Sequence, residues 1–271
     1  MKKAIIFITG IDLFFILLIG IAGLFQGVAG DLLHYLAFIL PIFIGFIFVR
    51  REKGEEEAKI SFGMKPSALP QFLPLIFPAT LAIIGVSFLT NLILTSLGYL
   101  PNSMPSEDFI TALLIHALLP AACEELLFRY IPIKLLLPHS GRWCIILSSI
   151  YFAMSHGNFF TIPYAALAGL IFVLIDIKFS SVLPSFILHL FNNALALFIG
   201  SEFFVSVPEF ILPLIFVMAT AASALIIFIK RKSYSDLLNP FFDKKRTEEV
   251  HYAPLIFVCV TVIVAFVNLA R

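Results

Sequence analysis

The chain has 271 residues, of which 61% are hydrophobic, 14% are aromatic and only 13% are charged. Soluble domains are about 45–50% apolar and about 25% charged, so this composition excludes a soluble globular domain. The net charge of +1 provides no basic surplus for binding a nucleic acid. We therefore expect an all-α polytopic transmembrane helix bundle in the cell membrane, with lipid covering its outside.

Nine apolar segments are candidate transmembrane helices, each of which needs about 20 mainly apolar residues. They cover residues 4–25, 32–49, 72–97, 109–137, 143–157, 162–177, 182–200, 208–229 and 253–270. The fifth and sixth are short, so we expect eight or nine spans. We divide the chain into two N-terminal helices with a charged loop (1–68), a core (69–203), and C-terminal helices with a basic loop (204–271).

Basic residues cluster at alternate ends of these segments, as expected when cytoplasmic loops are enriched in Lys and Arg. With the N-terminus in the cytoplasm, 17 of the 18 basic residues lie on the inner side, and Arg271 is the exception. The 17 are Lys2, Lys3, Arg50, Arg51, Lys53, Lys59, Lys65, Arg129, Lys134, Arg142, Lys178, Lys230, Arg231, Lys232, Lys244, Lys245 and Arg246. This pattern predicts a multi-pass membrane protein with a cytoplasmic N-terminus.

The fourth segment carries two adjacent acids, Glu124 and Glu125, followed by Arg129. An ionisable side chain costs about 2.5–3.5 kcal/mol or more at the bilayer centre, so it needs a partner or a function. Glu125 and Arg129 are four residues apart with the acid first, the favourable order for a helical ion pair. Glu124 points about 100° away from Glu125. We therefore expect Glu125 to pair with Arg129, and Glu124 to be the reactive carboxylate. Pro120, one turn earlier, should kink the helix and free a carbonyl.

Two further segments carry histidines at a similar depth in the membrane. His156 follows Phe152 by one turn in the fifth segment, and His189 precedes Asn193 by one turn in the seventh. At about 1.5 Å per residue, Glu124, His156, His189 and Asn193 all lie roughly 10–20 Å from the inner edge. Four polar side chains from three helices could therefore meet inside the membrane.

This set of side chains matches the needs of peptide hydrolysis. A buried glutamate beside a histidine can deprotonate a water and then protonate the leaving amine. A second histidine and an asparagine can donate hydrogen bonds to the tetrahedral oxyanion. No serine or cysteine nucleophile is required. The three cysteines, Cys123, Cys144 and Cys259, lie in apolar runs, and we interpret them as small buried hydrophobic residues.

Three motifs, in this order on separate helices, resemble those of a known family. They are Glu124-Glu125-x-x-x-Arg129, Phe152-x-x-x-His156 and His189-x-x-x-Asn193. The family comprises the CAAX-protease and bacteriocin-processing intramembrane endopeptidases, which include the type II CAAX prenyl endopeptidases. The resemblance covers about residues 70–200. It implies a hydrolase that acts on a membrane-associated peptide or lipidated protein, either a prenylated CAAX-type substrate or a leader peptide.

The resemblance also implies roles for individual residues. Glu124 and His156 would activate the water, His189 and Asn193 would form the oxyanion site, and the Glu125–Arg129 pair would support them. Two histidines and two carboxylates could also ligate zinc. Because no His-Glu-x-x-His pair lies on one helix, we expect no metal and no other cofactor. The expected partners are the substrate and membrane lipid.

Other interpretations of the same residues stay open. Buried Glu and His side chains also relay protons in a proton-coupled transporter. A non-catalytic membrane immunity or scaffold protein could retain the fold, and His189 with Asn193 could simply join helices. Outside the motifs, we expect Asp12 to make a polar contact between helices, His116 to line the cavity or pack, and Asn192 to join helices.

Overall fold

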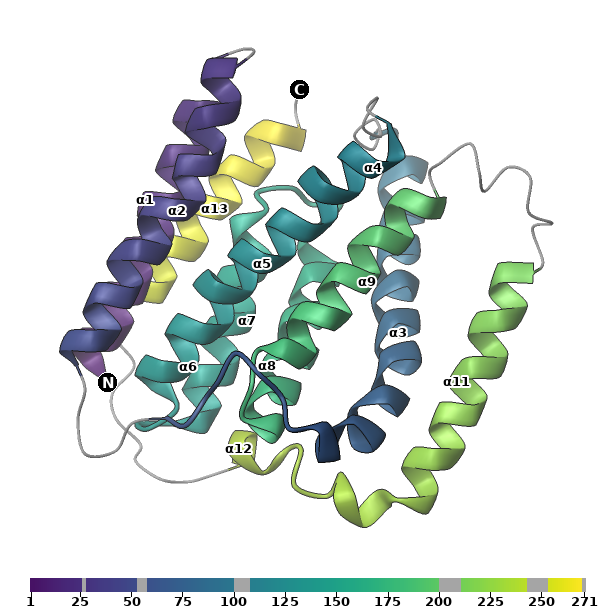
Figure 1. The fold of residues 1–271 in the computed structure, drawn as a ribbon. Helices are drawn as coiled ribbons and strands as arrows, with labels where there is room; N and C mark the ends of the chain where they lie inside the picture. Colours follow the sequence, from purple (N-terminus) through teal and green to yellow (C-terminus); the bar gives the residue numbers. More distant parts are fainter. Residues whose placement is uncertain (26–27, 53–57, 100–107, 200–210, 243–252, 270–271) are drawn as a thin grey trace.

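The computed structural model describes residues 1–25, 28–52, 58–99, 108–199, 211–242 and 253–269 (Figure 1). Most of these residues are helical and none lies in a strand, although an isolated bridge joins Ser61 and Ser181. Each of the nine predicted apolar segments contains a helix. The all-α helix bundle predicted from the sequence is confirmed.

The main helices are α1 (Lys2–Ala22), α2 (Val28–Arg51), α3 (Leu69–Ser96), α7 (Gly141–Ser155), α8 (Ile162–Phe179), α9 (Leu183–Ile199), α11 (Ile211–Ile229) and α13 (Ala253–Leu269). One further long helix consists of five consecutive pieces: α4 (Phe109–Ala112), η2 (Leu113–Leu118), α5 (Leu119–Glu125), η3 (Leu126–Tyr130) and α6 (Ile131–Leu136). Short helices at the ends of the bundle are η1 (Pro66–Ala68), η4 (Arg231–Ser233) and α12 (Asn239–Phe242).

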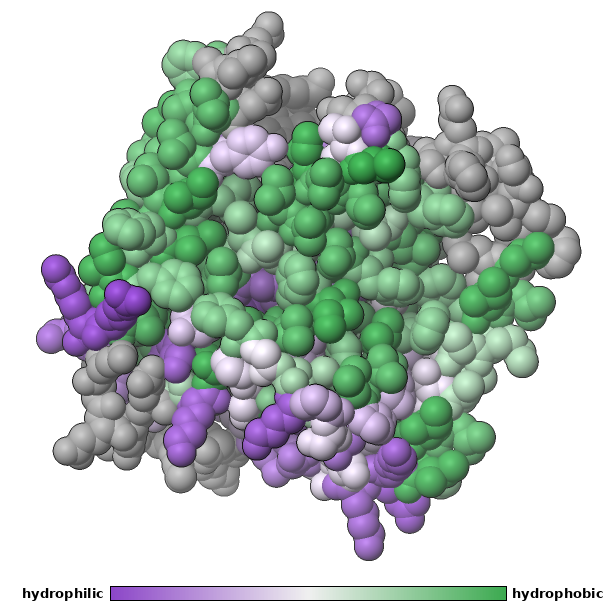
Figure 2. Space-filling model, in the orientation of Figure 1, coloured by the Kyte–Doolittle hydropathy of each residue, from purple (hydrophilic) through white to green (hydrophobic). Residues whose placement is uncertain are grey.

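Five helical segments in the described residues are long and apolar enough to cross a membrane. They are Lys2–Ala22, Leu32–Arg51, Pro66–Ser96, Phe109–Leu136 and Ile162–Phe179. Leu183–Ile199 and Leu214–Ile229 are apolar but shorter. Large apolar side chains are exposed around the bundle, and they form an apolar surface across the middle of the molecule (Figure 2). Such a surface suits lipid, and the helices satisfy their own backbone hydrogen bonds there.

The helix connections predicted to lie on the inner side gather at one end of the bundle, the lower end in Figure 1. Lys134 donates to the Ala58 carbonyl, and Lys178 contacts Asp236 at 2.5 Å, so distant segments meet there. Hydrophilic residues are concentrated toward the same end in Figure 2. Lys53, Lys244, Lys245, Arg246 and Arg271 lie outside the described residues.

One buried core joins the N-terminal, central and C-terminal helices. Its largest members include Ile8 of α1, Phe72 of α3, Phe128 of η3, Phe172 of α8 and Phe257 of α13. Helices α7 and α8 approach closely at Gly169, where an added Cβ would lie 3.0 Å from Cα of Ser149. The backbones of these two helices therefore hold their side chains in a tight, fixed arrangement.

The long helix from α4 to α6 changes to π-helical geometry twice, in η2 and η3. Proline has no N–H, so Pro120 and Pro132 leave the carbonyls four residues earlier without α-helical donors. Ser148 Oγ of α7 donates to one of these carbonyls, that of Phe128. The two π segments flank α5, which ends with Glu124 and Glu125. π-Helical turns occur often at functional sites.

Candidate active site

A cavity of about 490 Å³ lies inside the bundle, between α3, η2, α5, α7, α8 and α9. Its polar lining residues are His116, Glu124, His156, Tyr164, His189, Asn192 and Asn193. All four residues predicted to be catalytic therefore line one cavity. The predicted supporting residues, Glu125 and Arg129, lie behind this wall and are 2% and 0% exposed.

Glu124 and Glu125 occupy different environments, as their adjacent positions on a helix require. Glu125 Oε2 lies 3.5 Å from Arg129 Nε, so the predicted ion pair is present. Glu125 Oε1 lies 2.7 Å from His189 Nδ1, a contact that the sequence did not predict. The Glu124 side chain is 15% exposed and faces the cavity. Both carboxylate oxygens of Glu125 thus contact buried partners, Arg129 and His189, whereas the Glu124 carboxylate faces the cavity and is available to a ligand.

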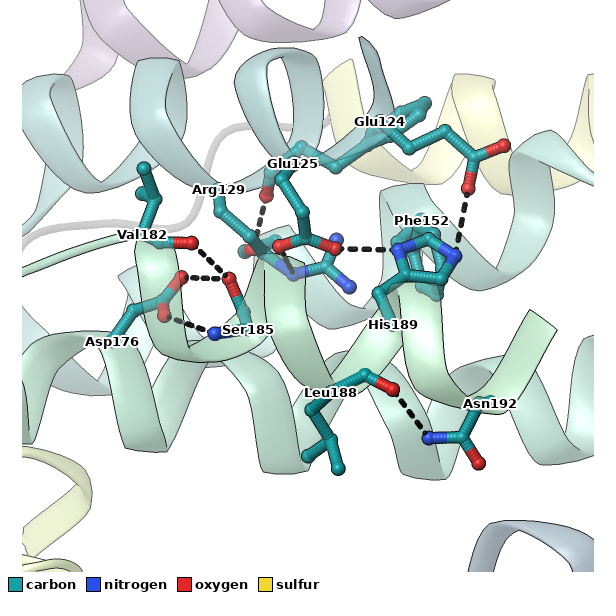
Figure 3. Close-up of polar contacts among 12 residues, drawn as sticks. Glu124, Glu125, Arg129, Phe152, Asp176, Val182, Ser185, Leu188, His189 and Asn192 are labelled. Atoms are coloured by element: carbon teal, nitrogen blue, oxygen red, sulfur yellow. Dashed lines mark hydrogen bonds and ion pairs between the residues drawn. The ribbon is translucent and has the colours of Figure 1, made fainter. Parts of the chain in front are cut away.

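His189 lies between the two glutamates (Figure 3). Its Nδ1 contacts Glu125, and its Nε2 is 3.6 Å from Glu124 Oε2, which is too long for a hydrogen bond. The rings of Phe152 and Phe172 lie 5.6 and 5.3 Å from the imidazole, centroid to centroid. These contacts fix the ring so that Nε2 faces the cavity.

Arg129 is fully buried, with its guanidinium carbon 4.0 Å above the ring of Phe152. None of its side-chain nitrogens makes a hydrogen bond to the described residues. The ion pair with Glu125 and the aromatic face therefore carry its charge. The prediction that Arg129 belongs to the inner basic face is wrong, because its charge is needed inside the bundle. Sixteen basic residues then remain in the inner-face pattern.

His156 forms the C-terminal cap of α7. Its Nδ1 lies 2.8 Å from the Phe152 carbonyl oxygen, which can only accept, so Nδ1 carries the proton of that bond. In the neutral ring Nε2 is then the basic nitrogen. No hydrogen bond joins His156 to Glu124 among the described residues, so the two predicted water-activating groups face one cavity without touching.

The two asparagines of α9 both line the cavity. Asn192 Nδ2 donates to the Leu188 carbonyl of its own helix at 2.8 Å, and its Oδ1 has no hydrogen-bond partner in the described part of the chain. The expected hydrogen bond from Asn192 to another helix is therefore not formed. Asn193 lies one turn after His189 on the same face.

The environments of Asp12 and Cys259 differ from those predicted. Asp12 is 1% exposed, and within the described residues neither carboxylate oxygen makes a hydrogen bond. The hydrogen bond that joins α1 to α7 is instead between Thr9 Oγ1 and Tyr151 Oη, at 2.6 Å. Cys259 is exposed rather than buried, whereas Cys144 is buried and Cys123 partly so. A lipid-facing position tolerates the small apolar side chain of Cys259 equally well.

A buried pair outside the three motifs also lies near the site. Asp176 Oδ1 and Oδ2 accept hydrogen bonds from Ser185 N at 3.1 Å and Ser185 Oγ at 2.7 Å. Both side chains are 0% exposed. The sequence placed Asp176 in a span but gave it no partner, because Ser185 belongs to the next helix.

As for metals, no group of three or more His, Cys, Asp or Glu residues in the described chain is arranged to hold an ion.

Residues 106–195 match a family model described as type II CAAX prenyl endopeptidase Rce1-like. The match confirms the resemblance drawn from the three motifs and includes every residue of those motifs. No curated protein and no solved structure matches the chain.

Proposed function

We propose that this chain, whose residues 106–195 match the Rce1-like type II CAAX prenyl endopeptidase family, is an intramembrane endopeptidase. In this proposal it hydrolyses a peptide bond of a membrane-associated substrate with a water activated by Glu124. One observation carries the proposal. Two adjacent acids sit on α5, and one is buried against Arg129 and His189 while the other faces a cavity with His156 and Asn193.

The attacking water lies between Glu124 and His156 in this mechanism. Glu124 takes a proton as the water oxygen bonds to the substrate carbonyl carbon, which gives a tetrahedral oxyanion. The basic Nε2 of His156 accepts a hydrogen bond from the same water, since its Nδ1–H is held by the Phe152 carbonyl. As the C–N bond breaks, the proton on Glu124 passes to the leaving amine. Such proton transfers contribute about 10²–10⁴-fold to a rate.

His189 and Asn193 stabilise the oxyanion. His189 gives its Nδ1–H to Glu125, so it donates into the cavity when Nε2 also carries a proton. Carboxylate oxygens of Glu124 and Glu125 lie 3.6 and 2.7 Å from its Nε2 and Nδ1. The amide of Asn193 lies one turn further along α9 and supplies the second donor. Arg129 pairs with one carboxylate oxygen of Glu125, and the other oxygen accepts from His189.

The cavity wall favours a substrate with apolar groups near the cleaved bond. Ala165 and Ala168 of α8 and Ala196 of α9 leave space beside the polar residues, and Ile83 and Leu197 complete an apolar side. A C-terminal or membrane-proximal segment of a lipidated protein, or a leader peptide, has this character. Entry from the inner side would bring such a segment past the basic end of the bundle.

The test is Glu124→Gln, which keeps the shape of the side chain and removes the base. Membranes from cells that carry the wild-type chain or the variant are compared by mass spectrometry of new peptide termini. Candidate substrates are then cleaved with purified protein. We expect Glu124→Gln to lower cleavage by about 10²–10⁴-fold and to melt like the wild type.

Glu52→Gln, at the exposed end of α2, is the matched control and should cleave normally. Full activity of Glu124→Gln would overturn the assignment of the base. Absence of cleavage by the wild type, together with pH-driven transport in vesicles, would favour the transporter.

A further inference from the structure

Asp176 is a buried carboxylate that takes no part in the mechanism above. It lies in the last turn of α8 and is 0% exposed. An acid near a helix C-terminus is disfavoured by the helix dipole, and an acid inside a membrane protein is costly. The position of Asp176 therefore requires stabilisation from outside α8.

The stabilising partner is the first turn of α9. Ser185 is the third residue of α9, where backbone N–H groups lack acceptors within the helix. Asp176 accepts from both the Ser185 backbone N–H and its hydroxyl. It thus caps α9 from the neighbouring helix, and there the dipole of α9 favours the negative charge.

The two hydrogen bonds hold the α9 face that carries the site. Ser185, His189 and Asn193 are spaced by four residues, so they form one stripe along α9. The contact between Asp176 and Ser185 lies four residues, or about 6 Å, before His189 along α9. It fixes both the depth and the rotation of α9, on which the 2.7 Å contact from His189 to Glu125 depends.

The contact between Asp176 and Ser185 also lies beside the buried ion pair of the site (Figure 3). Figure 3 shows Asp176 and Ser185 on the side of Arg129 away from Glu124. The buried cluster therefore continues from the cavity wall through Glu125 and Arg129 to the start of α9.

We propose that Asp176 is a positioning residue for the reaction: by clamping Ser185 it holds α9 so that His189 sits between Glu124 and Glu125. The role in cleavage rests on the proposed function, but the structural link between Asp176 and His189 does not.

Three variants separate the clamp from other effects. Asp176→Ala removes both hydrogen bonds to Ser185. Asp176→Asn keeps them, because the amide oxygen accepts from the Ser185 N–H and the amide nitrogen donates to the hydroxyl, which can turn to the Val182 carbonyl 3.0 Å away. Asp236→Asn, an exposed acid at the end of the bundle, is the control.

We expect Asp176→Ala to lower kcat by about 10²-fold with KM unchanged, as for a displaced catalytic group. Asp176→Asn should restore most of the rate. A wild-type kcat in Asp176→Ala would overturn the proposal, and so would an Asn variant as slow as the Ala variant. If Asp176→Ala does not fold, Asp176→Leu replaces it, because leucine fills the space of the carboxylate and accepts neither hydrogen bond, and there too a wild-type kcat would overturn the proposal.

A thermal-unfolding cycle tests the clamp without any substrate. Purified wild type, Asp176→Ala, His189→Ala and the double variant are melted in detergent, with Asp176→Leu in place of an unstable Asp176→Ala. We expect the double variant to lose less than the sum of the single losses, by about 2 °C or more, because the two residues act through one helix position. Strictly additive losses would refute the clamp. Coupled losses in a chain that cleaves nothing would support the clamp and refute only the proposed function.

Discussion

The buried ion pair of Glu125 and Arg129 gives a prediction that depends on no substrate. Arg129 is 0% exposed and Glu125 2% exposed, and Oε2 of Glu125 is 3.5 Å from Nε of Arg129. Replacing Glu125 with Gln leaves a buried guanidinium without its acid. Replacing Arg129 with Met leaves the carboxylate with His189 as its remaining partner in the described residues.

The burial of Glu125 and Arg129 determines how much stability each single substitution removes. Removing one partner of a buried pair costs about 3–5 kcal/mol, whereas replacing both is often far less costly. At about 2–4 °C per kcal/mol for a large domain, each single variant should melt roughly 6–20 °C lower than the wild type. The double variant Glu125→Gln/Arg129→Met should melt above at least one of the single variants. Met also retains the apolar contact with Phe152, which lies 4.0 Å from the guanidinium carbon.

The assay is thermal unfolding of the purified protein in one detergent. Unfolding is monitored by intrinsic fluorescence and by the loss of monodisperse protein. Asp236→Asn is the matched control, because it breaks the contact with Lys178 on a side chain that is 60% exposed. The Lys178 side chain is 6% exposed, but it keeps its hydrogen bond to the Ser233 carbonyl, and loss of a solvent-exposed partner costs about 0–1 kcal/mol. Single variants as stable as this control, or a double variant that loses the full sum, would refute the description of Glu125 and Arg129 as a coupled buried pair.

Two further predictions concern the backbone and the metal question. Ser148→Ala should destabilise the protein by about 1–3 kcal/mol, because the Phe128 carbonyl loses its donor, and the loss should shrink when Pro132→Ala restores an α-helical N–H. Equal losses in both backgrounds would contradict this account. Cleavage should survive prolonged dialysis against a zinc chelator, and activity lost to the chelator and restored by zinc would show that the metal-free mechanism is wrong.

The parts of the fold and site that depend on local spacing could be predicted from the sequence. Apolar runs located the helices, and the four-residue spacing of Glu125 and Arg129 predicted their ion pair. The depth of each motif along its helix placed the polar side chains of three helices at one level, and the cavity lining contains all of them. These inferences need only the rise and the periodicity of an α-helix.

Contacts that depend on how helices are rotated against one another could not be predicted in this way. His189 lies 64 residues from Glu125, and nothing in either motif states which glutamate its Nδ1 meets. Ser185 resembles any small residue at the start of an apolar helix, so its bond to Asp176 was missed. A useful signal was present, since an acid at the end of a helix is disfavoured until the start of the next helix is considered.

The different roles of the two adjacent glutamates follow from combining both kinds of information. Helix periodicity requires Glu124 and Glu125 to face different neighbours, but it does not decide which one reaches the interior. The buried Arg129 determines which one it is, because a guanidinium over the rings of Phe152 and Phe172 needs an acid within its own turn of the helix. Glu125 meets that need and also binds His189, so the cavity is left with a single acid in Glu124. The reactivity proposed for Glu124 is therefore a consequence of how completely its neighbour is occupied.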